Sequence, residues 1–220
     1  MGRRRVHGDQ TRIALLTAAE TLVARDGVAA LSVRNVAEAV GTSTRAVYSV
    51  FGSKEALVRG LAAHFFEALM DEVDAIPLTE DPLADLLAAL YGFRAFALKH
   101  PDSFRLALLW SPVPPDAGVL DAAVTAFARL ILRVERAQAI GLLPDRSSGE
   151  IAVELSGICN GLAGIELSGM PRDAADGLWS DGLGDVLRGL SAGAQRHDEP
   201  DVSDNLSRPI EANGALSHFT

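Results

Sequence analysis

The apolar residues of this chain recur every three or four positions, and glycine or proline interrupts the pattern at short intervals. This period is that of an amphipathic helix. The first such stripe consists of Ile13, Leu16, Ala19, Leu22 and Val23, and Gly27 follows as a natural helix end. Alanine and leucine are frequent, whereas runs of β-branched residues are few, so sheet is disfavoured. We therefore predict an all-α fold.

The same pattern predicts the remaining helices. The first 76 residues form three short helices and a long fourth one, which begins after Ser53 and ends before Pro77. Further helices are expected over residues 82–100, 102–110, 119–140, 148–168 and 173–195. From His197 onward the chain is polar without an apolar period, so we expect residues 197–220 to form a disordered tail.

The formal net charge of -9 is unevenly distributed. Residues 1–60 carry nine Lys/Arg and five Asp/Glu, a net charge of +4, whereas residues 61–220 carry eleven and twenty-four, a net charge of -13. A basic head on an acidic body suggests a polyanionic partner for the head alone. A chance cluster of surface arginines gives the same count, so charge alone leaves both interpretations open.

Several functional classes find no support in the sequence. The single cysteine, Cys159, excludes an internal disulfide, and no apolar run is long enough to span a bilayer, so we expect a cytoplasmic protein without membrane contact. His64 and Glu67 have the spacing of a metal-binding bundle motif but lack partner motifs. No phosphate-binding loop or nucleophile elbow is present. We predict neither a metal nor a cofactor, and no enzymatic activity.

Two of the predicted short helices meet at Gly41 and form a helix-turn-helix. Ser32 and Ser43 are placed to cap their starts, and Gly52 ends the second helix. The inner face of this second helix is expected to consist of Ala46, Val47, Val50 and Phe51, and the outer side of Thr42, Thr44, Arg45, Tyr48 and Ser49. Such donor-rich side chains suit base edges and phosphates in the DNA major groove. On spacing alone, an ordinary helical hairpin with a solvated polar face remains an alternative.

The segment LSVRNVAEAVGTSTRAVYSVFGSKEAL, residues 31–57, resembles the DNA-binding domain of the tetracycline-repressor (TetR) family of bacterial regulators. The matching features are the hydroxyl at Ser32, the VAEAVG run, the capping Ser43, Tyr48 three residues before Phe51, and SKEAL at the start of helix four. The resemblance implies DNA contacts from Ser32, Arg34, Thr42, Ser43, Thr44, Arg45, Tyr48 and Lys54. The segment departs from the family pattern at Ser49 and Val50, where family members often carry histidine or another bulky polar residue.

The resemblance also implies a division into domains. Residues 1–55 form the three-helix DNA-binding domain, in which residues 1–10 are a flexible basic arm with Arg3, Arg4 and Arg5. Residues 56–196 form a larger helical domain for ligand binding and dimerisation.

A coiled-coil spacing supports dimerisation through the last two helices. The expected interface consists of Ile151, Leu155, Ile158, Leu162, Ile165, Leu183, Val186 and Leu190. Gly157, Gly161 and Gly164 beside this seam permit close approach of another helix. The alternative is that both stripes face the chain's own core.

A ligand pocket is expected among the middle helices, where apolar and aromatic side chains are frequent. Its candidate residues are Phe66, Tyr91, Arg94, Phe96, Phe104, Trp110, Phe127 and Asn160, with Phe93 and Leu108 as further wall residues. Each of the apolar candidates also fits plain core. The segments HPDSFRLALL and SGICNGLAGIELSG resemble a subgroup of the family with a Trp/His-Gly signature, in which Asn160 takes a position where histidine is usual.

These observations predict a ligand-responsive transcriptional regulator, a repressor that a small molecule releases from its operator. Its partners are double-stranded DNA, a small-molecule effector and a second copy of the chain. The alternative is a helical adaptor or small-molecule-binding protein without sequence-specific DNA binding. That alternative leaves the basic head and its exposed donors unexplained.

Overall fold

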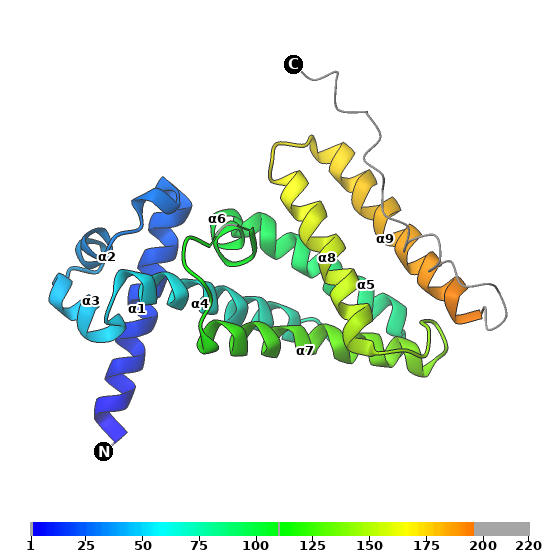
Figure 1. Ribbon diagram of the computed structural model, residues 1–220, viewed down its shortest axis with the longest axis horizontal. Coiled ribbons are helices and arrows are strands. Elements are labelled where there is room, and N and C mark those ends of the chain that lie inside the picture. Colours follow the sequence, from blue (N-terminus) through cyan, green and yellow to red (C-terminus); the bar gives the residue numbers. More distant parts are fainter. Residues whose placement is uncertain (1, 110, 196–220) are drawn as a thin grey trace, which may run out of the picture.

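The computed structural model describes residues 2–109 and 111–195, and this part of the chain is helical with short connections (Figure 1). Its helices are α1 Gly2–Asp26, α2 Val33–Val40, α3 Thr44–Phe51, α4 Lys54–Asp74, α5 Pro82–Lys99, α6 Pro101–Phe104, α7 Ala117–Ala139, α8 Ser148–Glu166 and α9 Arg172–Gln195. A 3-10 turn, η1 (Val28–Ala30), precedes α2, and a π-helical turn, η2 (Arg105–Leu109), follows α6. No strand occurs in the described ranges, and the all-α prediction is confirmed.

Helix α1 differs from the prediction in two respects. It begins at Gly2, so residues 2–10, expected as a flexible arm, belong to the helix. Ile13 is 56% exposed, whereas Leu15 is fully buried beside Leu16. The buried stripe is therefore rotated by part of a turn from the one inferred from spacing. The arginine side chains near the N-terminus, Trp110 and the predicted tail all lie outside the described residues.

The first three helices form a small domain at one end of the molecule (Figure 1). Its core includes Val23, Leu31, Val36, Val47 and Leu57, each with at most 1% exposure. Because α2 and α3 are only eight residues long, they are not stable as isolated helices. Packing against α1 and the start of α4 supplies the missing stabilisation.

The larger domain is built around α4 and α7, which run side by side, with α5 and α8 packed against α7 (Figure 1). Helix α9 lies against α8 as its antiparallel neighbour. Four aromatic rings, Phe65, Phe96, Phe104 and Phe93, meet at centroid distances of 5.2–6.4 Å where α4, α5 and α6 come together. Edge and tilted arrangements of this kind stabilise a core beyond the area they bury.

Helix α4 belongs to both domains. It packs against α1 and α3 of the small domain and against α5 and α7 of the larger one. Gly60 lies at the closest approach, because a Cβ atom there would come within 3.1 Å of the Phe51 ring and 3.3 Å of a Leu16 methyl. A glycine inside a helix costs stability relative to alanine, so its presence here is explained by this tight crossing.

Candidate nucleic-acid interface and ligand cavity

The turn between α2 and α3 is fixed by backbone hydrogen bonds and one side-chain cap. Gly41 adopts the left-handed conformation with φ 71°, which glycine tolerates best. The amide of Gly41 donates to Glu38 at 3.1 Å, and the amide of Thr42 donates to Ala37 at 2.8 Å. The Ser43 hydroxyl accepts a hydrogen bond from the Ala46 amide at 3.2 Å and so starts α3. These contacts set the direction in which α3 leaves the turn.

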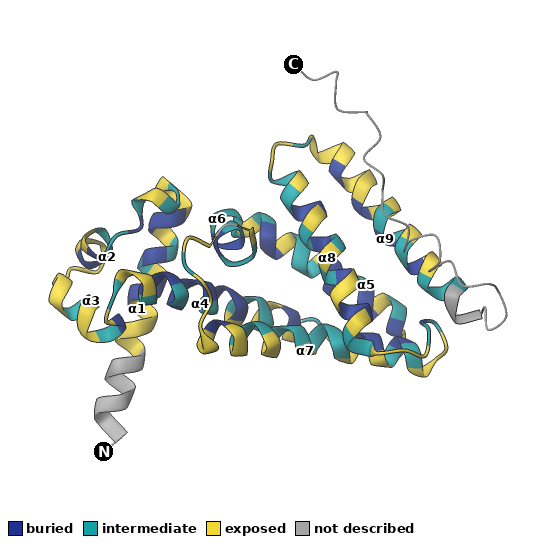
Figure 2. Cartoon of the chain, viewed as in Figure 1, coloured by how far each residue is buried: buried dark blue, intermediate teal, exposed yellow. Residues whose placement is uncertain are grey.

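Helix α3 buries one side and presents the other to solvent (Figure 2). Val47 is fully buried and Phe51 is 8% exposed, whereas Tyr48 is 50% exposed. Thr42, Ser43, Thr44, Arg45 and Ser49 are exposed as well. The predicted division into an inner and an outer side is confirmed for this helix. The outer side is a compact set of hydroxyl and guanidinium donors.

Phe51 anchors the C-terminal end of α3. The guanidinium of Arg12 from α1 lies 5.0 Å from the centroid of the Phe51 ring. Gly60 of α4, which has no side chain, leaves space for the same ring. Because α1 and α4 both contact this ring, α3 is held between two long helices. The packing therefore fixes the position of α3 and of its exposed side chains, as is required of a helix that recognises DNA bases.

Ser32 and Arg34 at the start of α2 already have partners within the chain. The Ser32 hydroxyl accepts from the Asn35 amide at 3.1 Å and serves as the N-cap. Arg34 donates to Glu38 at 2.9 Å, with both side chains mostly exposed. A phosphate contact from Arg34 would require this exposed pair to open.

The start of α4 carries the exposed Lys54 and, next to it, the carboxylate of Glu55. Ser53 caps the helix by accepting from the Ala56 amide at 3.1 Å. Hydrogen bonds from its own backbone amide and from Ser53 hold the pKa of Glu55 below its ordinary value. The Glu55 carboxylate thus already interacts with the positive end of this helix, so a phosphate bound by Lys54 would have an acidic neighbour.

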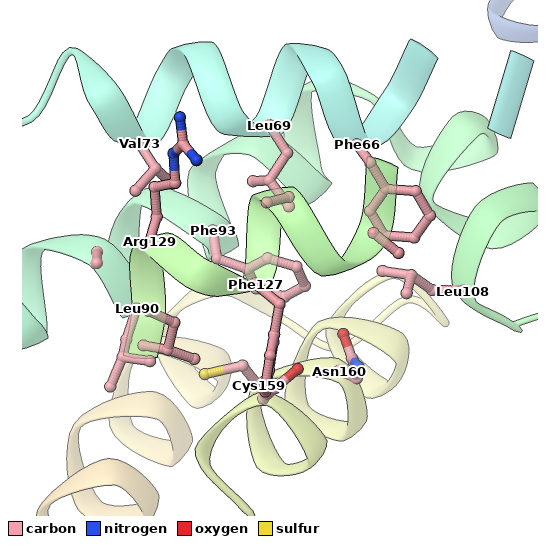
Figure 3. Close-up of a pocket in the computed structure, with 15 residues that line it drawn as sticks. Phe66, Leu69, Val73, Leu90, Phe93, Leu108, Phe127, Arg129, Cys159 and Asn160 are labelled. Carbon is pink, nitrogen blue, oxygen red and sulfur yellow. The ribbon is translucent and has the colours of Figure 1, made fainter. Parts of the chain in front are cut away.

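The second candidate site is a cavity of about 100 Å³ between α4, α5, α7 and α8 (Figure 3). Its walls are mainly apolar and include Phe66, Leu69, Leu90, Phe93, Leu108 and Phe127. Cys159 also lines it, and burial raises the pKa of this thiol to about 12, so the group is uncharged at neutral pH. The cavity is therefore suited to an apolar small molecule rather than to an ion.

Three polar residues interrupt the apolar wall: Arg129, Ser156 and Asn160. Arg129 is committed to Asp74, with Nη2 at 3.0 Å and Nε at 3.1 Å from the carboxylate. In contrast, the side-chain oxygen of Asn160 is buried without a hydrogen-bond partner among the described residues. Figure 3 shows Asn160 on α8 facing the region of Phe66 and Leu108.

The structure places the predicted pocket residues in three groups. Phe66, Phe127 and Asn160 line the cavity, together with Phe93 and Leu108. Phe96 and Phe104 lie instead in the aromatic cluster around Phe65, because both are almost fully buried between α4, α5 and α6. Tyr91 and Arg94 lie on another side of α5, and Trp110 is not described.

Tyr91 and Arg94 belong to a polar cluster that joins α5, α8 and α9. The Nε and Nη2 atoms of Arg94 donate to Glu166 at 2.9 and 2.8 Å, and Nη2 also donates to Asp176 at 2.6 Å. The Trp179 indole donates to Glu166 at 2.8 Å, and the Tyr91 ring packs beside it at 6.3 Å. The hydrogen bonds that Arg94 donates to Glu166 raise the pKa of its guanidinium. This cluster holds α9 to the body and leaves Arg94 unavailable to the cavity.

The predicted dimer seam is only partly accessible. Ile151, Leu155 and Leu183 are almost fully buried in the chain's own core, and Leu162 is 9% exposed. Ile158, Val186 and Leu190 are half-buried, and Ile165 is 48% exposed. Four of the eight residues thus cannot meet a partner without opening the core. The open face of α8 includes Val153, Gly157, Gly161 and Ile165, with the exposed Glu150 and Glu154 beside them, and nothing lies within 4 Å of a Cβ placed on either glycine.

Some functional residues were missed by sequence reasoning. The Arg34–Glu38 pair has the four-residue spacing of helical ion pairs, so spacing was an available signal. Gly60 was marked by its position inside a long helix. Asp74, which holds Arg129 at the cavity wall, had no local signal, since its partner is 55 residues away.

A short, clamped helix with exposed donors, attached to a larger helical domain with an apolar cavity, defines a helix-turn-helix transcriptional regulator. The sequence profile of "Bacterial regulatory proteins, tetR family" matches residues 15–61, and that of "Tetracyclin repressor-like, C-terminal domain" matches residues 86–186. The chain belongs to the tetR family of bacterial regulators.

Individual relatives agree with this assignment. The chain is 33% identical over 115 residues to the HTH-type transcriptional regulator AlkX of Mycobacterium tuberculosis, a match that covers 52% of this chain and 53% of AlkX. The chain thus matches about half the length of this curated relative. A protein of unknown function from Rhodococcus sp. RHA1 shares 26% identity with a TM-score of 0.69, over 82% of this chain and 95% of that one.

A further solved structure is that of RolR in complex with resorcinol. It has 17% identity and a TM-score of 0.64, and the match covers 90% of this chain and 99% of RolR. At this identity the likeness concerns the fold alone. Members of the family bind DNA operators and small-molecule effectors and act as dimers.

Neither a membrane-spanning helix nor a metal-ligand cluster occurs among the described residues. None of their helices combines the length and the hydropathy needed to cross a membrane. None of their His, Cys, Asp and Glu side chains gather in groups of three or more that would suit a metal ion. His64 and Glu67, which have a metal-motif spacing, lie 3.6 Å apart as an isolated pair.

Proposed function

We propose that this protein is a homodimeric repressor that a small molecule releases from a double-stranded DNA operator. The observation that carries the proposal is the outer side of α3, where Thr44, Arg45 and Tyr48 are exposed on a helix clamped by its neighbours. A helix of this size enters the major groove, and these donors match base edges and phosphates. Thr42, Ser43 and Lys54 flank the same surface and are assigned to phosphate contacts.

Dimerisation follows from the way paired reading helices find DNA. Two copies of α3 must lie roughly 34–36 Å apart to enter successive major grooves. The open face of α8 is suited to hold them together, because two glycines between Val153 and Ile165 permit close helix approach. The interface proposed here uses this face rather than the buried residues of the predicted seam.

Helix α4 is the proposed link between effector and DNA. Phe66, Leu69 and Val73 of this helix line the cavity, whereas Gly60 and Lys54 lie toward the DNA-binding domain. Lys54 and Phe66 are twelve positions apart, a length of about 18 Å, so a tilt of about 5° at the cavity moves the other end by about 1.5 Å. A ligand acts on this equilibrium only through its difference in affinity between the two positions of α4.

Fluorescence anisotropy with the DNA upstream of the protein's own gene tests the DNA-binding half of the proposal. Wild type is expected to bind this DNA more tightly than a scrambled duplex, with affinity falling as salt rises. The double variant Arg45→Ala/Tyr48→Ala is expected to lose specific binding while remaining dimeric on sizing. Arg188→Ala, which removes an exposed guanidinium on α9, serves as the charge-matched control.

Two outcomes of this experiment contradict the proposal. Unchanged DNA binding by the double variant would remove α3 from the reading role. Equal affinity of wild type for specific and scrambled DNA would favour a helical adaptor or small-molecule-binding protein.

The proposed role further places the protein in the cytoplasm, where DNA is accessible, without enzymatic activity of its own.

A further inference from the structure

The cavity between α4 and α8 contains one polar atom whose hydrogen-bonding capacity is unused. The Asn160 side-chain oxygen is buried and has no partner among the described residues. Leaving such an acceptor unpaired is costly, so buried polar atoms of this kind normally have a partner. Since Asn160 also lines the cavity, a molecule that fills the cavity is the natural source of the missing donor.

Arg129, the charged residue of the wall, does not compete for this role. Arg129 donates three hydrogen bonds to Asp74 and a fourth to the Thr125 carbonyl. The charge of Arg129 is thus balanced before any ligand arrives. A carboxylate ligand would have to displace Asp74 and lose its own hydration in an apolar cavity, which is unfavourable. The described wall therefore favours a neutral ligand.

The size of the cavity limits the body of the ligand. Its volume is about 100 Å³, and an apolar cavity of about 150 Å³ is known to accommodate benzene. The walls include the rings of Phe66, Phe93 and Phe127, which suit edge or offset contacts with another aromatic ring. The body of the ligand is therefore limited to a short alkyl chain or one aromatic ring, and a ring the size of benzene already requires a small outward movement of the wall. A large polycyclic molecule requires the helices to move apart.

We propose that the cavity selects a small neutral molecule with an apolar body of about one ring and a single hydroxyl that donates to the Asn160 oxygen. Asn160 is then the specificity-determining residue of the effector site. The inference rests on the proposed function, because it names the chemical class of the effector. It adds the requirement that the ligand bring a hydrogen-bond donor and no charge.

Four probes of similar size separate these requirements: p-cresol, 4-methylanisole, toluene and 4-methylbenzoate. The first donates a hydrogen bond, the second only accepts one, the third does neither, and the fourth is charged. Binding to the full-length protein is measured by isothermal titration calorimetry in the absence of DNA. We expect p-cresol to bind roughly tenfold more tightly than 4-methylanisole and toluene, since one hydrogen bond to a buried acceptor contributes about that factor. Binding of 4-methylbenzoate is expected to be weaker still.

The variant Asn160→Leu keeps the size of the side chain and removes its acceptor. It is expected to bind p-cresol no more tightly than toluene, because the hydroxyl of p-cresol then enters the cavity without its acceptor. Thr125→Val is the control: it removes an exposed hydroxyl on α7 outside the cavity wall and is expected to preserve the tenfold preference. Circular dichroism and thermal unfolding of each variant report whether the fold is retained.

Several results would overturn the inference. Equal binding of p-cresol and 4-methylanisole by wild type would remove the donor requirement. Tighter binding of 4-methylbenzoate would remove the neutrality requirement, and retention of the preference in Asn160→Leu would assign it to another group. Saturation by none of the four probes would also overturn it.

Failure of the inference is distinguishable from failure of the proposed function. If p-cresol binds through Asn160 but leaves the anisotropy-measured DNA affinity unchanged, the ligand class stands and the repressor mechanism fails. If DNA binding is specific but the probes do not bind as expected, the regulator stands and the ligand class fails. Calorimetry without DNA and anisotropy with DNA therefore report on separate claims.

Discussion

Replacement of Glu38 by glutamine is expected to strengthen DNA binding. The Glu38 carboxylate accepts from Arg34 at 2.9 Å on the surface that is proposed to face the duplex. Residues 32–55 contain three cations and two carboxylates, Glu38 and Glu55, so the proposed interface is nearly neutral within one subunit. The Glu38→Gln substitution removes one negative charge close to phosphate and releases the Arg34 guanidinium for a phosphate contact.

The fold has little to lose from this substitution. The Arg34 and Glu38 side chains are 80% and 63% exposed, and such pairs contribute at most about 1 kcal/mol. Here arginine precedes glutamate by four residues, which is the weaker orientation, and Glu38 lies in the last turn of α2, where the helix dipole disfavours a carboxylate. We expect the free energy of unfolding to change by less than about 0.5 kcal/mol.

The effect on DNA binding is larger because the proposed dimer carries the change twice. Two additional phosphate contacts steepen the slope of log K against log salt by about 1.8. Between 50 and 200 mM salt this slope changes the ratio of variant to wild-type affinity by about tenfold. The gain of the variant is thus expected to be largest at low salt and to shrink as salt rises.

The measurement is a salt series of anisotropy titrations with wild type, Glu38→Gln and a control. Glu72→Gln makes the same chemical change on α4 at a side chain that is 49% exposed and pairs with Lys99, away from the proposed interface. Equal slopes for Glu38→Gln and wild type would refute the placement of Arg34 beside phosphate. A similar gain for Glu72→Gln would mean that only overall charge matters.

Three further predictions concern stability, pH and assembly. Glu166→Leu is expected to lower the free energy of unfolding in urea by about 3 kcal/mol, because it leaves the Trp179 indole without its acceptor and the largely buried Arg94 guanidinium with Asp176 alone. Asp176→Asn, at a side chain 58% exposed, is expected to lower it by less than about 1 kcal/mol, and equal losses would contradict this account of the cluster. Hydrogen bonds from arginine hold the pKa of Asp74 below 3.8, so its contribution to stability is present above that pH and is lost as the pH falls through the lower folded-state value. Acid titration of stability is therefore expected to be shallower in Asp74→Asn than in wild type. On sedimentation, Val153→Arg is expected to be monomeric, whereas Val124→Arg, at a more exposed site on α7, remains dimeric; a dimeric Val153→Arg would place the interface elsewhere.

The DNA-binding unit was predictable because its determinants are local. The hydroxyls of Ser32, Ser43 and Ser53 each accept a hydrogen bond from the backbone amide three residues further along the chain. These hydrogen bonds follow from the order of residues alone. Glycine at 41 and at 52 adopts positive φ at the two helix ends. Caps and turns of this kind need no knowledge of the rest of the fold.

The dimer seam and the pocket depended on information that periodicity does not contain. An apolar stripe indicates that one side of a helix is buried, but not whether the covering surface belongs to the same chain or to a partner. Ile151 and Leu155 satisfied the coiled-coil spacing, and their burial within one chain meets the same requirement. Arg94 looked like a polar group for the pocket, but its partner Glu166 lies 72 residues away in sequence.

Helix α4 explains why a chain with a nearly neutral reading surface can still be switched. In the proposed dimer, specific affinity depends on two copies of α3 entering their grooves together, and the position of each copy depends on the crossing at Gly60. The crossing brings a backbone without a side chain against Phe51 and Leu16, so a larger residue there would separate the helices. The cavity lies on the same helix, at Phe66 and Val73, about two to four turns further along. A ligand that favours one tilt of α4 thus changes the spacing of the reading helices without touching either, and the size of the response is limited by its preference between the two tilts.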